Sequence, residues 1–187
     1  MFREERNYRY FLELYVRHVH AAVDTYAYCL LRNHFHLLVR VKTEEEWESA
    51  VKPSQGSEPC EGLAQRTFNP SRRFSNLFNA YAQAINKAYG RTGSLFEERF
   101  RRIEVTSYSH FTNLIFYIHF NPQKHGFVED FRTWPWSSYN ALCSSTPTKL
   151  NRDTVLAWFG GVQRFRSFHQ GAVDERSIAP LIADDWF

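Results

Sequence analysis

The chain has little cysteine and no long apolar run, and each shortage excludes a class of protein. Its 187 residues contain three cysteines, Cys29, Cys60 and Cys143. They are odd in number, widely separated and without a Cys-x-x-Cys pair, which argues against a disulfide framework and a zinc knuckle. No apolar stretch is long enough to cross a bilayer, and residues 1–6 lack the apolar centre of a secretory signal. We therefore expect a cytoplasmic protein without a membrane partner.

The net charge is only +3, but basic residues are concentrated between residues 66 and 102. Eight Arg and Lys side chains lie there against two glutamates, so the segment carries about +6. Aromatic residues are interleaved with them, and this combination can bind phosphates and stack on bases. The alternative is an amphipathic helix with aromatic residues in the core and arginines in solvent. The candidate nucleic-acid-binding residues are Arg72, Arg73, Lys87, Arg91, Arg99, Arg101 and Arg102.

His34 and His36 are the first candidates for a metal site. Residues 26–40 around them are mainly β-branched, aromatic or aliphatic, which predicts a strand, and residues two apart in a strand share a face. The spacing alone carries little weight, because His18 and His20 repeat it in a segment with helical periodicity. The alternative is that His34 and His36 are the polar face of an antiparallel sheet.

Hydrophobic periodicity and end signals predict a mixture of helices and strands, an α+β protein. The first half of the chain is expected to contain a helix over 3–20, strands over 23–31 and 34–41 around a turn at Arg32–Asn33, and a short helix and a loop within 42–62. The second half is expected to contain a helix over 71–89 capped by Ser71, a strand over 99–105 and a helix that begins at Thr106 or Ser107. Two or three short C-terminal helices follow.

The helix that opens at Thr106 or Ser107 is the second candidate for chemistry. Tyr117 and Asn121 are four residues apart and share one side of it. Because the position before Pro122 disfavours helical geometry, we expect the helix to stop at Asn121. Two imidazoles and an amide oxygen can hold a divalent ion with open positions for a phosphate, and the phenol would then be the nucleophile. As one of ten tyrosines, Tyr117 has an alternative role as an amphipathic surface residue.

Four motifs in this order resemble the single-tyrosine HUH transposases, and within them the REP-associated tyrosine transposases. They cover about residues 8 to 140 and are RNHFHLL at 32–38, YGRTGSLFEERF at 89–100, YIHFNPQKHG at 117–126 and WPWSSY at 134–139. The resemblance implies a ferredoxin-like antiparallel sheet with helices on one face. It places the transposase domain over residues 1–140 and a C-terminal helical extension over 141–187.

The resemblance also implies an activity, which is cleavage and rejoining of single-stranded, hairpin-forming DNA with Mg²⁺ or Mn²⁺. Tyr117 would be the nucleophile that forms a 5′-phosphotyrosine link, His34 and His36 would be metal ligands, and Asn121 the third ligand. His119 faces another side of the helix and is a weaker candidate. The expected oligomeric state is a monomer, with a dimer through an exposed sheet edge as the alternative.

The chain departs from the family pattern at its start. Family members begin with an additional apolar strand, whereas this chain enters its first helix almost at Met1, so the first strand is expected to be missing and the edges of its neighbours exposed. One alternative function is therefore an inactive, N-terminally truncated hairpin-DNA-binding protein. Another is a metal-dependent phosphodiesterase that uses water and needs no tyrosine. The presence of both histidines, Tyr117 and Asn121 favours the transposase.

Overall fold

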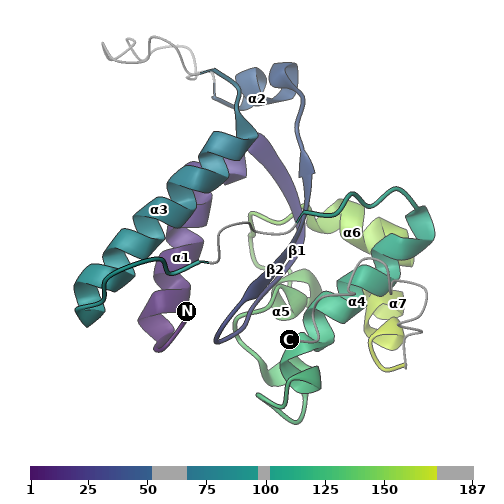
Figure 1. Cartoon of the computed structure of the whole chain (residues 1–187). Helices are drawn as coiled ribbons and strands as arrows, with labels where there is room; N and C mark the ends of the chain where they lie inside the picture. Colours follow the sequence, from purple (N-terminus) through teal and green to yellow (C-terminus); the bar gives the residue numbers. More distant parts are fainter. Residues whose placement is uncertain (52–66, 97–101, 172–187) are drawn as a thin grey trace. The chain divides into compact units, whose positions relative to one another are not determined.

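The computed structural model describes residues 1–51, 67–96 and 102–171 (Figure 1). The chain forms two compact units. The first contains residues 1–3, 25–39 and 97–187, and the second contains residues 4–24 and 40–96. Helices and a two-stranded antiparallel sheet make up the described residues, so the prediction of an α+β protein is confirmed.

The sheet is a hairpin of β1 (Val23–Leu30) and β2 (Phe35–Val41). A two-residue turn at 32–33 joins the strands, and the N–H of Leu31 donates to the carbonyl of His34 across it at 2.9 Å. Most of β1 is buried, as expected from its run of aromatic and aliphatic residues. The two predicted strands and the turn between them are confirmed.

The edge of β1 that faces away from β2 is closed by a later part of the chain. The N–H of Leu30 donates to the carbonyl of Trp136 at 2.9 Å. The N–H of Ser138 donates to the carbonyl of Tyr28, also at 2.9 Å. On this side of β1 the backbone groups of Tyr28 and Leu30 are therefore paired by the segment after the helix and are not left exposed.

Helix α4 (Tyr108–Lys124) runs through Pro122 instead of ending at Asn121, so this prediction was wrong. Pro122 removes one backbone N–H donor, but the carbonyls of Asn121 and Pro122 both accept hydrogen bonds. Asn121 O accepts the N–H of His125 at 2.9 Å, and the carbonyl of Pro122 accepts a backbone N–H at 2.8 Å. Gly126, at φ 69°, then turns the chain out of the helix. These terminal hydrogen bonds offset the local preference of the pre-proline residue.

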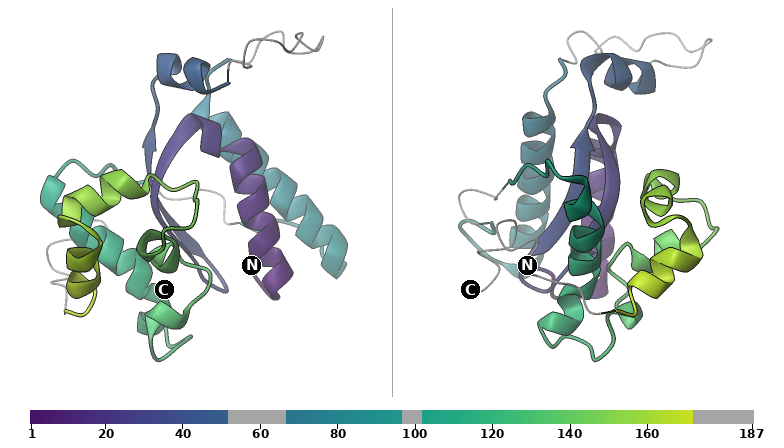
Figure 2. Two further views of the ribbon diagram at one scale, coloured as in Figure 1. Left: turned by 180° about the vertical axis from the view of Figure 1, so that it is seen from behind. Right: turned by 90° about the vertical axis from the view of Figure 1, so that its right-hand side faces the viewer.

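Short helices follow α4, as predicted for the end of the chain. They are η2 (Phe131–Thr133), α5 (Tyr139–Cys143), α6 (Arg152–Phe159) and α7 (Val162–Phe168). Both views of Figure 2 show α5, α6 and α7 gathered beside α4. Trp158 on α6 packs its ring 4.7 Å from Tyr26 of β1 and 4.9 Å from Phe111 of α4, measured between ring centroids. Aromatic contacts thus join these helices to the hairpin within the first unit.

A buried chain of hydrogen bonds links β1, α4 and α7. The ring of His169 donates from Nδ1 to the carbonyl of Phe165 at 2.8 Å, so its Nε2 must accept. His119 Nδ1 lies 3.0 Å from that Nε2 and therefore donates, which leaves His119 Nε2 as the acceptor of the Ser138 hydroxyl at 2.7 Å. Ser138 Oγ in turn accepts the N–H of Tyr28 at 2.9 Å. Each of these hydrogen bonds thus has one donor and one acceptor when both imidazoles are neutral.

The second unit is built on two helices, α1 (Glu5–His18) and α3 (Pro70–Tyr89). They run in opposite directions and lie side by side in Figures 1 and 2. Phe11 of α1 meets the buried Tyr81 of α3 edge to face, with ring centroids 5.1 Å apart. The short elements η1 (His20–Ala22) and α2 (Glu44–Val51) complete this unit among the described residues. The helices predicted over 3–20 and 71–89 are confirmed.

The start of α3 differs from the prediction. Asn69, not Ser71, is the N-cap, because its side-chain oxygen accepts the N–H of Arg72 at 2.9 Å and Pro70 occupies the first helical turn. The helix ends at Gly90, at φ 61°, as the sequence predicted. The strand expected over 99–105 is not found at residues 102–105, and its remainder lies outside the described residues. In the described part of the chain no helix combines the length and apolar character needed to span a membrane.

The neutral histidine chain makes stability sensitive to acid. Burial lowers the pKa of His119 well below its usual range and lowers the pKa of His169 to about 4. As the pH falls below about 6.5, the unfolded chain binds protons that the folded protein does not. We expect the free energy of unfolding to fall between about pH 6.5 and pH 4, with His169 alone contributing about 3 kcal/mol to the loss. Urea unfolding followed by tryptophan fluorescence measures this, and His169→Gln should flatten the pH slope.

The hydroxyl of Ser138 offers a second test of the same network. Ser138→Ala leaves His119 Nε2 buried without a donor, so we expect a loss of about 1–3 kcal/mol in the free energy of unfolding. Ser137→Ala is the matched control, since Ser137 is also buried and its Oγ makes no hydrogen bond to the described residues. Equal losses in the two variants, measured by denaturant unfolding, would contradict this role for Ser138.

Candidate active site

The first unit brings the two predicted histidines together. His34 lies directly before β2, and His36 is the second residue of that strand. Their ring centroids are 5.0 Å apart and the ring planes are nearly perpendicular, at 88°. The Nε2 atoms of both rings are buried. The hairpin therefore presents two imidazole nitrogens within one small region.

The tyrosine helix faces the same region of the first unit. The ring of Tyr117 lies 6.1 Å from the ring of His36, measured between centroids. Asn121 follows one turn later on α4 and is fully buried, at 0% exposure. Its side-chain Nδ2 donates to the carbonyl of Tyr117 at 2.8 Å, which fixes the orientation of the amide. The structure thus brings His34, His36 and Tyr117 together and places Asn121 one turn after Tyr117 on the same helix.

The atoms available at this place suit a divalent cation. Asn121 Oδ1 is buried and accepts no hydrogen bond from the described residues, while the Nδ2 of the same amide donates to the carbonyl of Tyr117. His34 Nδ1 lies 3.0 Å from Asn33 Oδ1, which leaves His34 Nε2 as the nitrogen with a lone pair. Two imidazole nitrogens and an amide oxygen are acceptable ligands for Mn²⁺ and, through oxygen, for Mg²⁺. Among the described residues no group of three or more His, Cys, Asp or Glu is arranged for a metal, so such a site depends on the amide.

Sequence reasoning missed two residues, one beside Tyr117 and one beside His34. The Lys124 ammonium lies 4.6 Å from the centre of the Tyr117 ring. The ring of His125 lies 5.2 Å from that of His34. Both were within the motif that carries Tyr117, and their positions seven and eight residues after it place them on the same side of the helix. Helical spacing could therefore have found them.

Tyr117 itself is almost completely buried, with 1% of its surface exposed. Its ring is held between His36 on one side and the Lys124 ammonium on another. A phenol in this position is shielded from bulk water, and a phosphate can reach its oxygen only after a rearrangement.

His119, the weaker ligand candidate, lies outside this group. Both of its ring nitrogens are used by Ser138 and His169, and the side chain is fully buried. No lone pair is left for a metal ion. His119 instead anchors α4 through its hydrogen bonds to Ser138 and His169. The spacing of the motif alone did not predict this role.

The predicted nucleic-acid-binding residues are divided between the two units. Arg72, Arg73, Lys87 and Arg91 belong to the second unit, on α3 or just after it, and the exposed Arg102 precedes α4 in the first unit. Arg99 and Arg101 lie outside the described residues. Arg73 sits over the ring of Trp47, with its guanidinium carbon 5.3 Å from the ring centre.

The aromatic residues of the basic segment pack against one another within the second unit. The ring of Phe96 lies 5.0 Å from that of Phe78 and 6.2 Å from that of Tyr81, measured between centroids. Tyr81 is fully buried. Tyr81 is therefore a core residue, as the amphipathic-helix alternative predicts, whereas Phe78 and Phe96 are only half-buried.

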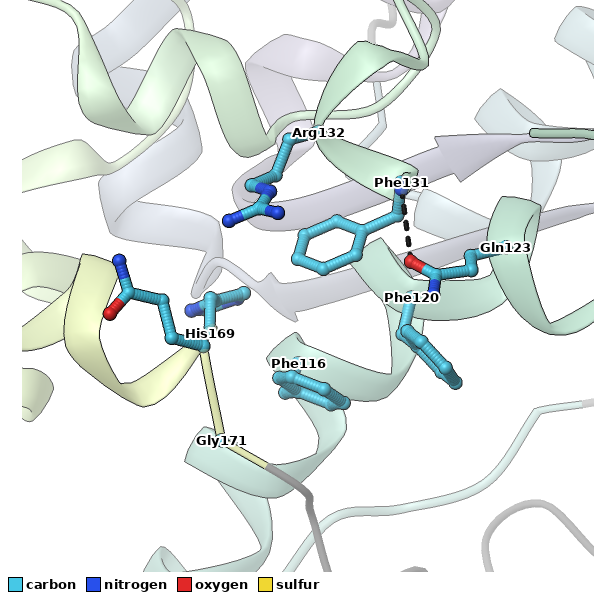
Figure 3. A pocket seen from close by; sticks show the side chains of 8 residues that line it. Phe116, Phe120, Gln123, Phe131, Arg132, His169 and Gly171 are labelled. Carbon is cyan, nitrogen blue, oxygen red and sulfur yellow. Dashed lines mark hydrogen bonds between the residues drawn. The ribbon is translucent and has the colours of Figure 1, made fainter. Parts of the chain in front are cut away.

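A separate pocket of about 240 Å³ opens on another face of α4 (Figure 3). Figure 3 shows Phe116, Phe120 and Gln123 reaching it from that helix, each one position before Tyr117, Asn121 and Lys124. One position is about 100° around a helix, so the pocket faces away from the candidate site. The polar groups at its rim already have partners, because Gln123 Oε1 accepts the N–H of Phe131 at 3.2 Å and Arg132 pairs with Asp130 at 2.8 Å. Its lining is completed by Phe131, Arg132, His169, Gln170 and Gly171.

The fold and the site define an α+β protein in which a His-x-His pair on a hairpin lies beside a tyrosine on a helix, and a buried asparagine follows that tyrosine one turn later. No family model matches the chain, and no solved structure matches it. Over 124 residues, 65% of its length, the chain is 26% identical to a curated Haemophilus influenzae protein named "Putative REP-associated tyrosine transposase". The chain spans 61% of the length of that relative. This similarity confirms the family resemblance that the four motifs predicted.

The amide of Asn121 can be tested directly as a ligand. Asn121→Leu keeps a side chain of similar size but removes the buried oxygen, so we expect Mn²⁺ affinity, measured by isothermal titration calorimetry, to fall about tenfold or more. Asn140→Leu is the control, because the amide of Asn140 bonds to the carbonyl of Arg132 and not to a candidate ligand. Unchanged Mn²⁺ affinity in a folded Asn121→Leu protein would exclude this oxygen as a ligand.

Proposed function

We propose that this protein is a transposase that cleaves and rejoins single-stranded, hairpin-forming DNA through a 5′-phosphotyrosine intermediate. One observation carries the proposal, which is that the ring of Tyr117 lies 6.1 Å from that of His36, one helical turn before the buried Asn121. The name of the H. influenzae relative supports the class of activity. The protein is proposed to act as a cytoplasmic monomer.

The reaction requires only the exchange of phosphate esters. The oxygen of Tyr117 attacks the phosphorus atom and the bond from phosphorus to the 3′ oxygen breaks, so a free 3′-hydroxyl leaves and the 5′ end stays on the tyrosine. Attack of a 3′-hydroxyl on this link reverses the step and joins strands without a nucleotide cofactor. Bound Mg²⁺ or Mn²⁺ would polarise the phosphate oxygens. His34, His36 and Asn121 would hold the ion.

Lys124 is placed to assist in the same step. Its ammonium lies 4.6 Å from the centre of the ring that carries the nucleophilic oxygen. A positive charge at this position attracts the DNA backbone and favours the negative charge that develops during transfer. We assign Lys124 to binding of the phosphate next to the nucleophile.

The burial of Tyr117 favours a second candidate function. With 1% of its surface exposed, the tyrosine must be uncovered before it can attack, and DNA binding would have to cause this change. A protein that binds hairpin DNA without cleaving it needs no such change. The two functions predict different products from the same DNA.

The test uses the full chain, Mn²⁺ and a labelled library of single-stranded hairpins with random flanks. We expect a protein–DNA adduct that survives denaturation, and we expect Tyr117→Phe to lose it at least about a thousandfold because no other group replaces the nucleophile. Tyr10→Phe, a change at a partly exposed tyrosine in the second unit, should form the adduct normally. Sequencing the trapped strands would identify the target.

The other outcomes separate the alternatives. Hairpin binding by folded protein without an adduct would support the non-catalytic binding protein. Hydrolysis that persists in Tyr117→Phe without an adduct would support a phosphodiesterase that uses water. An adduct of equal yield in Tyr117→Phe would show that another residue is the nucleophile.

A further inference from the structure

The turn of the hairpin carries a side chain that controls one of the candidate ligands. Asn33 is exposed and occupies the second position of the two-residue turn, and its Oδ1 lies 3.0 Å from His34 Nδ1. An amide oxygen can only accept, so the proton of this hydrogen bond must be on the imidazole Nδ1. The contact therefore selects one tautomer of His34.

That tautomer is the one a metal ligand needs on its other nitrogen. A neutral imidazole has one N–H and one lone pair, so a proton on Nδ1 leaves the lone pair on Nε2. His34 Nε2 is the buried atom, on a ring whose centroid lies 5.0 Å from that of His36, whereas Nδ1 points to the turn. The opposite tautomer would put a hydrogen atom where a cation should bind.

The backbone of the turn keeps the donor and the acceptor in place. The carbonyl of His34 accepts the N–H of Leu31 at 2.9 Å, which closes the two-residue loop and fixes the start of β2. Asn33 is thereby held directly before the ligand whose ring it contacts. A leucine at this position cannot accept the imidazole proton.

We propose that Asn33 is a positioning residue for metal binding, which orients the ring of His34 and holds its proton on Nδ1. This inference rests on the proposed function, because it assigns His34 to a divalent cation. Hydrogen bonds of this kind from a ligating histidine typically change metal affinity by about 10–100-fold. Asn33 would touch neither DNA nor metal, and its effect passes through His34.

The experiment compares the full-length wild-type chain with Asn33→Leu and Asn33→Asp. Nitrogen-15 NMR of histidine-labelled protein at pH 8, without metal, reports the tautomer of each of the eight imidazoles, and a His34→Gln sample assigns the His34 signals. We expect the Nδ1–H form in the wild type and in Asn33→Asp, whose carboxylate also accepts, and a shift toward Nε2–H in Asn33→Leu. Calorimetric titration with Mn²⁺ should show affinity about 10–100-fold weaker in Asn33→Leu and restored in Asn33→Asp.

The outcomes separate this inference from its alternatives. Unchanged tautomer in Asn33→Leu would overturn the inference whether or not Mn²⁺ affinity falls, because the residue would then act only on the turn. A changed tautomer with unchanged Mn²⁺ affinity would overturn the link to metal binding. If the tautomer and affinity change as expected but the wild type forms no DNA adduct, the role of Asn33 stands and the proposed transposase activity fails.

Discussion

The geometry of the candidate site depends on the hydrogen bonds of one serine. Ser138 is joined to the backbone of Tyr28 in β1 by its N–H and by its Oγ, and its hydroxyl donates to His119 on α4. Tyr117 and Asn121 lie two residues before and two after His119. The rotation of α4 about its axis, and with it the direction of both side chains toward the hairpin, is therefore fixed by a contact that belongs to neither the nucleophile nor a ligand.

Histidines in the first unit have two different roles, structural support and candidate metal binding, and their hydrogen bonds distinguish the two. His119 and His169 use both ring nitrogens within the protein, and burial keeps them neutral, with the pKa of His169 at about 4. His34 keeps Nε2 on the buried side and gives only Nδ1 to its neighbour Asn33. A ring with both nitrogens bonded to protein holds helices together, while a ring oriented through one nitrogen can offer the other to a cation.

Local patterns in the sequence predicted what local forces determine. Alternation and helical spacing gave the hairpin, the main helices and the grouping of Tyr117 with Asn121, while the motifs supplied the pairing of the helix with the histidines. The errors arose where distant or terminal hydrogen bonds outweigh local preference. The helix passes Pro122 because carbonyls near its end keep backbone donors. Ser138 could not be assigned from sequence, because its partner Tyr28 lies 110 residues away.

The same anchoring limits how a DNA strand could reach the nucleophile. The Tyr117 ring lies 6.1 Å from that of His36 and only 1% of the residue is exposed, so no phosphate reaches the phenol in this conformation. Rotation of α4 would open this space only by breaking the buried bond from Ser138 to His119, with the loss of a satisfied polar group. Rotation of the Tyr117 side chain about its own torsions, or bending of the hairpin near its turn, breaks no such bond. If Tyr117 cleaves DNA, the movement that exposes it therefore belongs to the tyrosine or to the hairpin, and α4 remains the fixed support.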